Sequence, residues 1–333
     1  MHPLKPTHSE KLAKAPFDDL QTDLILQSSD KVHFRVFKPI LSLASPIFNN
    51  MFSIPLPPSQ NPDEVQVVPL SEDSAALDIA LRHIYPVRPP KVADTLHYAN
   101  ICAEFARKYQ VEALDIFITA YLTDSVERDP VGVYAIAVTY GYKNIGAIAA
   151  RSCLNLPFSG LKSPYLRCIT AEHISELHRY HVACGEAAAT TASLDRTWFM
   201  FLSENGIAKT IASQHSCRLC TISDFMAHDC DGDITGIGPR CLWNYLFRSS
   251  SVLAHHPANA EITTEAFVLE SNNCQACAKS VQGEMIQISV ILGKMVKQAI
   301  EQVSSSFYLL SMFNSACSYV TGSLTYICFR GTE

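Results

Sequence analysis

The sequence predicts an α+β fold, with a small sheet and short helices in the first third of the chain and a mainly α-helical region after it. Two observations predict this order. Strand-like segments occur only before residue 70, and helical spacing of apolar residues dominates from residue 74 onward. The 333 residues are 48% hydrophobic and 17% charged, so the chain can bury a core of ordinary size.

Three strands are expected in the first third of the chain, at residues 23–27, 32–37 and 65–68. Residues 28–31 are turn formers, so the first two strands should form a hairpin. In the second strand Val32, Phe34 and Val36 alternate with polar neighbours, which directs one set of side chains to the core.

Helices are expected between and after these strands, at residues 38–43, from 46, from about 74, from about 92, at 131–140 and at 144–154. Ser45 and Pro46 mark one start clearly, because serine can cap free helix amides and proline suits the first helical position. Prolines at 86, 89 and 90 separate two of the helices.

Five segments, in this order, resemble the BTB/POZ domain family. They are Asp23-Leu24-Ile25-Leu26, the run from Phe34 to Phe52, Val67-Val68-Pro69-Leu70, Leu81-Arg82-His83-Ile84-Tyr85-Pro86, and Ala106-Arg107-Lys108-Tyr109-Gln110-Val111. The sequence of these segments most resembles that of the BTB group of mushroom-forming (basidiomycete) fungi. One departure is Phe37, where the family usually has histidine, which replaces a polar contact with apolar surface. The resemblance covers residues 17–125.

The resemblance implies a compact domain that pairs with a copy of itself or another BTB chain, so a homodimer is expected. In some members the domain engages a cullin-type ubiquitin ligase scaffold. Asp23 and Lys38 match charged family positions near the dimer seam, with a solvated salt bridge as the alternative. Phe17, Leu41 and Leu43 are candidate apolar contacts for the partner, with an intramolecular core as the alternative.

The chain divides into a flexible polar leader (1–16), the BTB/POZ domain (17–125), a helical region (126–303) and an uncharged apolar tail (304–333). The leader lacks the apolar run of a secretory signal, which predicts a cytoplasmic or nuclear protein. The net charge of −6 comes without a basic stripe, so direct nucleic-acid binding is not expected. In a reducing compartment, most of the twelve cysteines should be buried thiols.

Two CxxC pairs, Cys217/Cys220 and Cys274/Cys277, are the sharpest chemical signal, because four thiolates can hold a structural zinc ion. The long separation of the pairs leaves open the alternative of thiols in separate helices. Substitute ligands are available in the same region, namely His215, His228, Cys230 and Cys241. A redox CxxC is disfavoured, since neither pair follows a strand at the head of a helix.

Other polar clusters fit plainer interpretations. Residues 228–233 begin like a calcium loop but lack its later glycine and glutamate, so a polar turn is expected. A helix-like stretch gathers three histidines and a glutamate without HExxH spacing, which favours a solvated helix face over a metal site. Its members are His173, Glu176, His178 and His181. No nucleophile elbow, phosphate loop or dinucleotide fingerprint occurs in the sequence.

Between residues 302 and 329 the sequence carries no charge. Residues 307–329 approach the length of a bilayer span, but frequent Ser, Thr, Asn and Gly favour a buried terminal helix over membrane insertion. We therefore expect a protein-interaction adaptor rather than an enzyme. The alternatives are a metal-dependent enzyme using the C-terminal Cys/His cluster, which lacks a motif-spaced base, and an adaptor tethered to a membrane by its tail.

Overall fold

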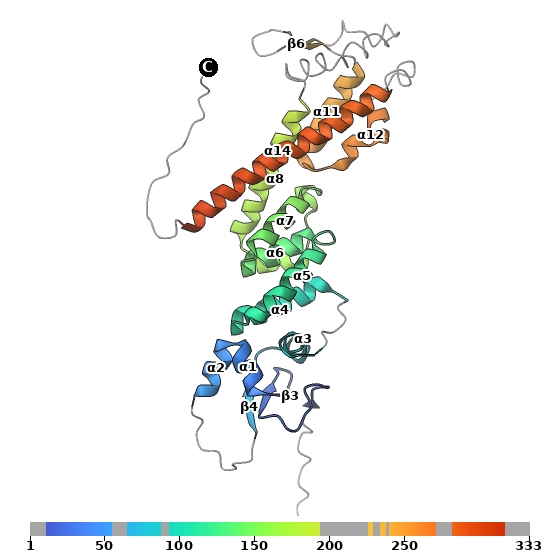
Figure 1. The fold of residues 1–333 in the computed structure, drawn as a ribbon. Coiled ribbons are helices and arrows are strands. Elements are labelled where there is room, and N and C mark those ends of the chain that lie inside the picture. Colours follow the sequence, from blue (N-terminus) through green and yellow to red (C-terminus); the bar gives the residue numbers. More distant parts are fainter. Residues whose placement is uncertain are drawn as a thin grey trace, which may run out of the picture. The chain divides into compact units, whose positions relative to one another are not determined.

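The computed structural model describes residues 11–54, 65–87, 93–193, 226–228, 234–237, 240–270 and 282–316, with backbone alone at 226–228, 234–237, 240 and 307–316. The chain forms two compact units (Figure 1). Unit 1 comprises residues 1–152 and 162–170, and unit 2 comprises residues 153–161 and those from 171 onward. The chain therefore crosses from one unit to the other three times.

Unit 1 contains a four-stranded sheet of order β1-β3-β2-β4. Its strands are β1 (Lys11–Leu12), β2 (Leu24–Gln27), β3 (Val32–Val36) and β4 (Gln66–Pro69). The hairpin expected between residues 23 and 37 is confirmed, because β2 and β3 pair antiparallel, while β1 joins β3 and β4 joins β2 in parallel. Strand β1 was not predicted, and it lies in the segment expected to be a flexible leader.

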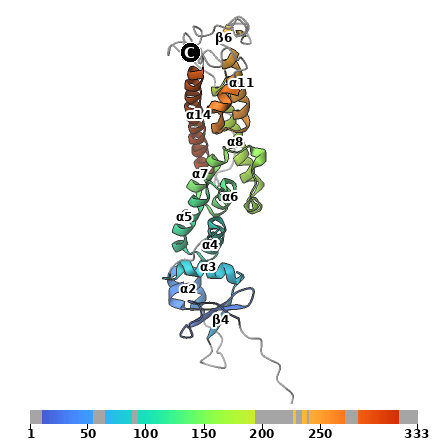
Figure 2. The same cartoon turned by 90° about the vertical axis from the view of Figure 1, so that its right-hand side faces the viewer.

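The described part of unit 1 also contains seven α-helices. They are α1 (Lys38–Ala44), α2 (Pro46–Ser53), α3 (Ser74–Ile84), α4 (Thr95–Tyr109), α5 (Asp115–Ser125), α6 (Pro130–Tyr140) and α7 (Lys143–Cys153), with 3₁₀ turns η1 (Glu112–Leu114) and η3 (Pro164–Cys168). Helices α1 and α2 lie between β3 and β4 in the chain, and the others follow β4. Helices α1 to α3 lie on one side of the sheet, and α4 and α5 come next (Figures 1 and 2). The predicted α+β class is confirmed.

Side-chain caps fix the starts of α2, α3, α4 and α6. The predicted cap is confirmed, because the Ser45 hydroxyl accepts a hydrogen bond from the Phe48 amide at the start of α2. Aspartates cap α3, α4 and α6 in the same way, at Asp73, Asp94 and Asp129. Each cap satisfies an amide that the helix itself leaves free.

Aromatic side chains pack together at several places in the core of unit 1. Phe17 packs against Phe34 and Tyr85 beside the sheet. Between α2 and α4, the Phe48 and Tyr109 rings stack with centroids 4.6 Å apart. Phe17, Phe34 and Phe48 are fully buried, so these rings supply a large part of the apolar area removed from water.

Unit 2 is mainly helical, as predicted. It contains η2 (Phe158–Gly160), α8 (Ala171–Thr191), β5 (Met226–His228), β6 (Ile234–Ile237), α11 (Arg240–His255), η6 (Ala260–Thr263), α12 (Glu265–Glu270) and α14 (Gln282–Ala316). Helix α8 packs against both α11 and α14. The antiparallel pair β5–β6 was not predicted; the polar turn expected between its strands lies outside the described residues.

Close contacts join the described helices of unit 2. A Cβ atom built on Gly185 of α8 would lie 2.6 Å from the Ala254 carbonyl oxygen of α11, so only glycine permits this approach. The hydroxyls of Tyr180 and Ser304 lie 2.8 Å apart and join α8 to α14. Residues 304–316 of the predicted tail continue α14, and the rest of the tail lies outside the described residues.

Candidate functional site

Helices α1 and α2 meet at a rigid corner. Ser45 ends α1 and caps α2, and its fully buried hydroxyl also donates to the Tyr109 carbonyl of α4. At the other end of α1, the Phe37 amide donates to the Tyr85 hydroxyl and the Lys38 amide donates to Asp23 Oδ1, each at 2.8 Å. Both ends of α1 are thereby fixed before any partner binds.

The outward sides of these two helices carry exposed apolar side chains. Leu43 on α1 is 92% exposed, and Ile54 at the end of α2 is 66% exposed. Pro39 lies four residues before Leu43 and therefore on the same side of α1, and it is exposed as well. We call Pro39, Leu43 and Ile54 the α1–α2 surface. Contiguous exposed apolar side chains are typical of a surface that another protein covers.

The predicted interaction residues fall in three different environments. Phe17 and Leu41 are fully buried, so they fill the core of this chain and offer nothing to a partner in this fold. Leu43, two residues after Leu41, faces solvent instead. Asp23 and Lys38 lie together, and their contact is a hydrogen bond from the Lys38 backbone amide to the Asp23 carboxylate, which caps α1.

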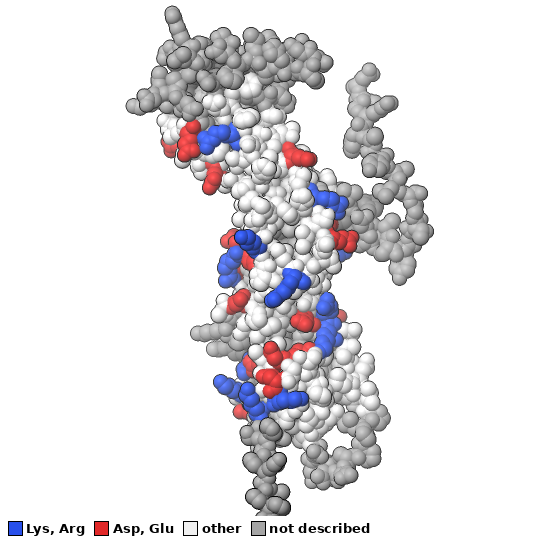
Figure 3. Space-filling view, turned by 180° about the vertical axis from the view of Figure 1, so that it is seen from behind, with Lys and Arg blue, Asp and Glu red and all other residues white. Residues whose placement is uncertain are grey.

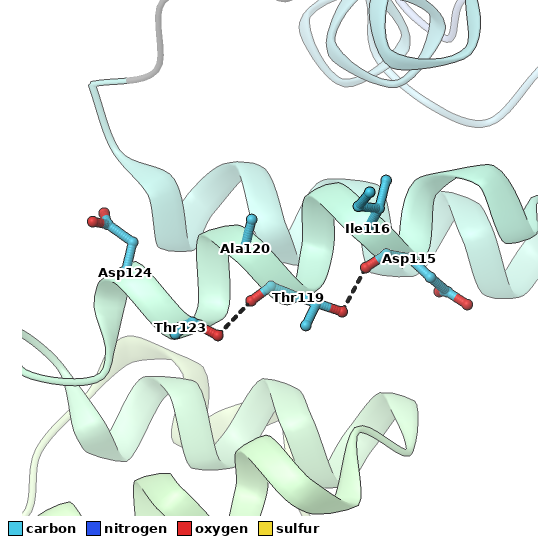
Figure 4. Close-up of a pocket in the computed structure, with 6 residues that line it drawn as sticks. All are labelled: Asp115, Ile116, Thr119, Ala120, Thr123 and Asp124. Atoms are coloured by element: carbon cyan, nitrogen blue, oxygen red, sulfur yellow. Dashed lines mark hydrogen bonds between the residues drawn. The ribbon is translucent and has the colours of Figure 1, made fainter.

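A second surface lies on α5 and was missed in the sequence. It consists of Asp115, Ile116, Thr119, Ala120, Thr123 and Asp124, which line an open hollow of about 670 Å³ (Figure 4). We call these six residues the α5 face. Ile116 is 73% exposed. The spacing of apolar residues in the sequence could have indicated this surface. The buried Leu114, Ile118 and Leu122 repeat every four residues, and Ile116 falls outside that repeat.

The polar groups of the α5 face are mostly bonded within unit 1. The Thr119 and Thr123 hydroxyls donate to the carbonyls of Asp115 and Thr119, four residues earlier. Asp115 accepts from the Tyr142 hydroxyl, and Asp124 accepts from Arg128. The centre of the face is therefore apolar and its two ends are acidic.

His83 of α3 is buried and contacts α5 through Phe117 and Tyr121, which lie beside the α5 face in the sequence. Its Nε2 lies 2.8 Å from the Tyr121 hydroxyl and its Nδ1 lies 2.7 Å from the Ile79 carbonyl oxygen. The ring meets Phe117 edge-on, with centroids 4.8 Å apart. Burial lowers the pKa of His83, and the hydrogen bond to Ile79 opposes this in part.

Charged side chains of both signs are interspersed over the face of the molecule shown in Figure 3. That arrangement differs from the continuous basic stripe that holds a phosphate backbone. Among the residues that the structure describes, four ion pairs join neighbouring side chains, three of them in unit 1. Lys108 of α4, for example, donates to Glu72 at 2.6 Å, and the neighbouring Tyr109 hydroxyl donates to the same carboxylate.

The four cysteines of the predicted zinc site, Cys217, Cys220, Cys274 and Cys277, lie outside the described residues, as do His215 and Cys230. Cys241 is buried on α11. Among the residues that the structure describes, no three His, Cys, Asp or Glu side chains are grouped so that they could hold a metal ion. The zinc site stays a prediction.

The histidine-rich stretch lies on α8. His181 is buried and its Nε2 donates to the Leu156 carbonyl at 2.9 Å, while the exposed His178 contacts the Phe158 ring. The expected solvated face therefore holds for part of the stretch only. None of the described helices is long and apolar enough to cross a membrane.

Comparison with known proteins agrees with the sheet and helices of unit 1. Residues 14–125 match the family model of the BTB/POZ domain. No curated protein matches the chain. The matched residues include β2 to β4, α1 to α5 and both surfaces described above. Residues 14–125 of this chain are therefore a BTB/POZ domain, the fold of a protein-interaction module.

Proposed function

We propose that this chain is an interaction adaptor that self-associates through its BTB/POZ domain, with the α1–α2 surface as the contact between two copies. One observation carries the proposal: Leu43 is almost fully exposed on a helix whose two ends are fixed. A homodimer with twofold symmetry would bury this side chain twice. Because α1 is ordered in advance, association would cost little conformational entropy.

Asp23 stabilises the start of the helix that carries Leu43. Its carboxylate accepts the first amide of α1, so Asp23→Ala should loosen the helix that carries Leu43. We expect the double variant Asp23→Ala, Lys38→Ala to weaken self-association more than folding. Asp23→Asn, which keeps the accepting oxygen, is the matched control. Unchanged dimer affinity in the double variant would count against a role for this pair.

We propose a second partner for the α5 face, namely a scaffold of the cullin type. The support is the exposed, centrally apolar stripe around Ile116 together with the BTB/POZ assignment. A chain that pairs through one surface and holds a scaffold through another would bring whatever it binds to a ubiquitin ligase. The likeness to fungal BTB chains and a cytoplasmic or nuclear location also stay predictions.

A pair of substitutions separates the two surfaces. Leu43→Asp should abolish the dimer and keep binding to a purified cullin N-terminal domain, while Ile116→Asp should keep the dimer and lose the scaffold. Both side chains are exposed, so folding should be unchanged, which a melting temperature checks. Analytical ultracentrifugation and calorimetry measure the two contacts. A dimer of full affinity in Leu43→Asp would rule out the α1–α2 surface.

A further inference from the structure

His83 has one protonation state that fits its surroundings. A carbonyl oxygen can only accept, so Nδ1 must carry the proton that is donated to Ile79. The neutral ring then has an unprotonated Nε2, which accepts from the Tyr121 hydroxyl. Tyr121 is on α5, so this hydrogen bond holds α5 to α3. His83 is 6% exposed, which keeps water from replacing the bond.

Adding a proton at Nε2 would reverse this contact. Nε2 would become a donor, so the Tyr121 hydroxyl would have to accept and turn its own proton toward another group. Tyr98 and Cys102 of α4 are titratable groups that interact with Tyr121. Burial raises the pKa of Cys102 to about 12, so its thiol stays neutral and gives the imidazolium no counter-charge.

Charged groups on α3 and on the elements around it do not balance the charge of a protonated His83 ring either. Arg82 and Asp78, on α3 itself, are paired with each other at 2.7 Å. Burial lowers the pKa of His83, the Ile79 carbonyl opposes that shift, and neither Lys38 on α1 nor Glu112 on η1 adds to it. A charged ring at this position would therefore be buried with its charge unbalanced.

We propose that His83 makes the attachment of α5 to α3 depend on pH, so that protonation of its ring loosens α5 and disorders the α5 face. The residues that hold α5, Phe117 and Tyr121, each follow directly after a residue of that face, Ile116 and Ala120. A shift of the inner side chains therefore moves the outer ones. The consequence for scaffold binding rests on the proposed function, whereas the loosening itself does not.

The direction of the pH dependence follows from the linkage between proton binding and folding. The folded state disfavours the charged ring, so the stability that neutral His83 provides is present above the unfolded pKa of about 6.5 and is lost as pH falls toward the lower folded value. One proton changes an opening equilibrium by at most about tenfold for each pH unit. The protection of α5 amides against hydrogen exchange should fall within this limit below pH ~6.5.

Hydrogen–deuterium exchange of the full chain between pH 7.5 and 5 tests the proposal, with rates corrected for the pH dependence of an unstructured chain. We expect protection of residues 115–125 to fall in wild type and to stay level in His83→Gln, which cannot titrate. His83→Phe keeps a ring and serves if the Gln variant does not fold. His181→Gln, the same change at the buried histidine of unit 2, should leave the fall in α5 intact.

Tyr121→Phe gives an independent readout. Removing the hydroxyl takes away the donor that favours the neutral ring, so the imidazole resonances of His83 should titrate at higher pH than in wild type. An equal fall in His83→Gln, no fall in wild type, or an equal fall across β2 and β3 would overturn the proposal. If α5 loosens with pH but Ile116→Asp binds the scaffold normally, the docking proposal fails and the pH dependence stands.

Discussion

Replacing Leu43 with alanine should weaken self-association by orders of magnitude and leave the fold intact. The substitution removes three carbons from a side chain that is 92% exposed in the single chain. At about 0.8 kcal/mol per buried CH₂, each copy would lose roughly 2.4 kcal/mol of pairing free energy, and the dimer about 5 kcal/mol. At 1.4 kcal/mol per tenfold, the dissociation constant should rise by about three to four orders of magnitude.

Folding should be affected little, because the lost atoms make few contacts within the chain and alanine favours helices. Sedimentation equilibrium over a wide concentration range measures the dissociation constant, and native mass spectrometry counts the subunits. Ile148→Ala on α7 is the matched control, since Ile148 is also aliphatic, exposed and in unit 1. A change in affinity below tenfold, or one equal to that of the control, would refute the assignment of Leu43 to the contact.

Three further predictions concern the rest of the chain. Gly185→Ala should destabilise unit 2 by about 1–3 kcal/mol, because the new Cβ meets the backbone of α11, whereas Gly283→Ala, with open space around it, should not; chemical denaturation measures both. Asp30→Asn should reduce the loss of stability as pH falls from 4 toward 2, because the Ser74 and Ser28 hydroxyls lower the pKa of Asp30 to about 2; acid unfolding monitored by circular dichroism tests this. Cys217→Ser and Cys274→Ser should each abolish zinc binding in native mass spectra, and stoichiometric zinc in either variant would exclude the four-cysteine site.

Much of the BTB/POZ fold could be predicted from local signals. Residues 28–31 between two strand-like runs predicted the hairpin, and Ser45-Pro46 predicted the start of α2, because turns and caps depend on a few neighbouring side chains. Strand β1 has two residues and is stabilised by pairing with β3 rather than by its own sequence. No local pattern could indicate it.

The candidate site was harder to predict, because burial depends on what packs against a residue. Leu41 and Leu43 lie on the same helix, yet one is fully buried and the other is 92% exposed. Helical spacing shows that they face different directions but not which direction is the core. The same holds for Ile116 and Ile118 on α5. The pairing of Asp23 with a backbone amide, rather than with the Lys38 side chain, likewise required the position of α1.

The path of the chain between the two units matters for anyone producing the BTB/POZ domain alone. Residues 162–170 return to unit 1, where the Ser163 hydroxyl donates to the Asp129 carboxylate that caps α6, and Thr139 bonds the Cys168 carbonyl. A recombinant fragment ending at residue 125, where the family match stops, would also lose Tyr142, the partner of Asp115 on the α5 face. A fragment ending at Thr170 keeps these bonds, so it should express better and give the more faithful binding measurements.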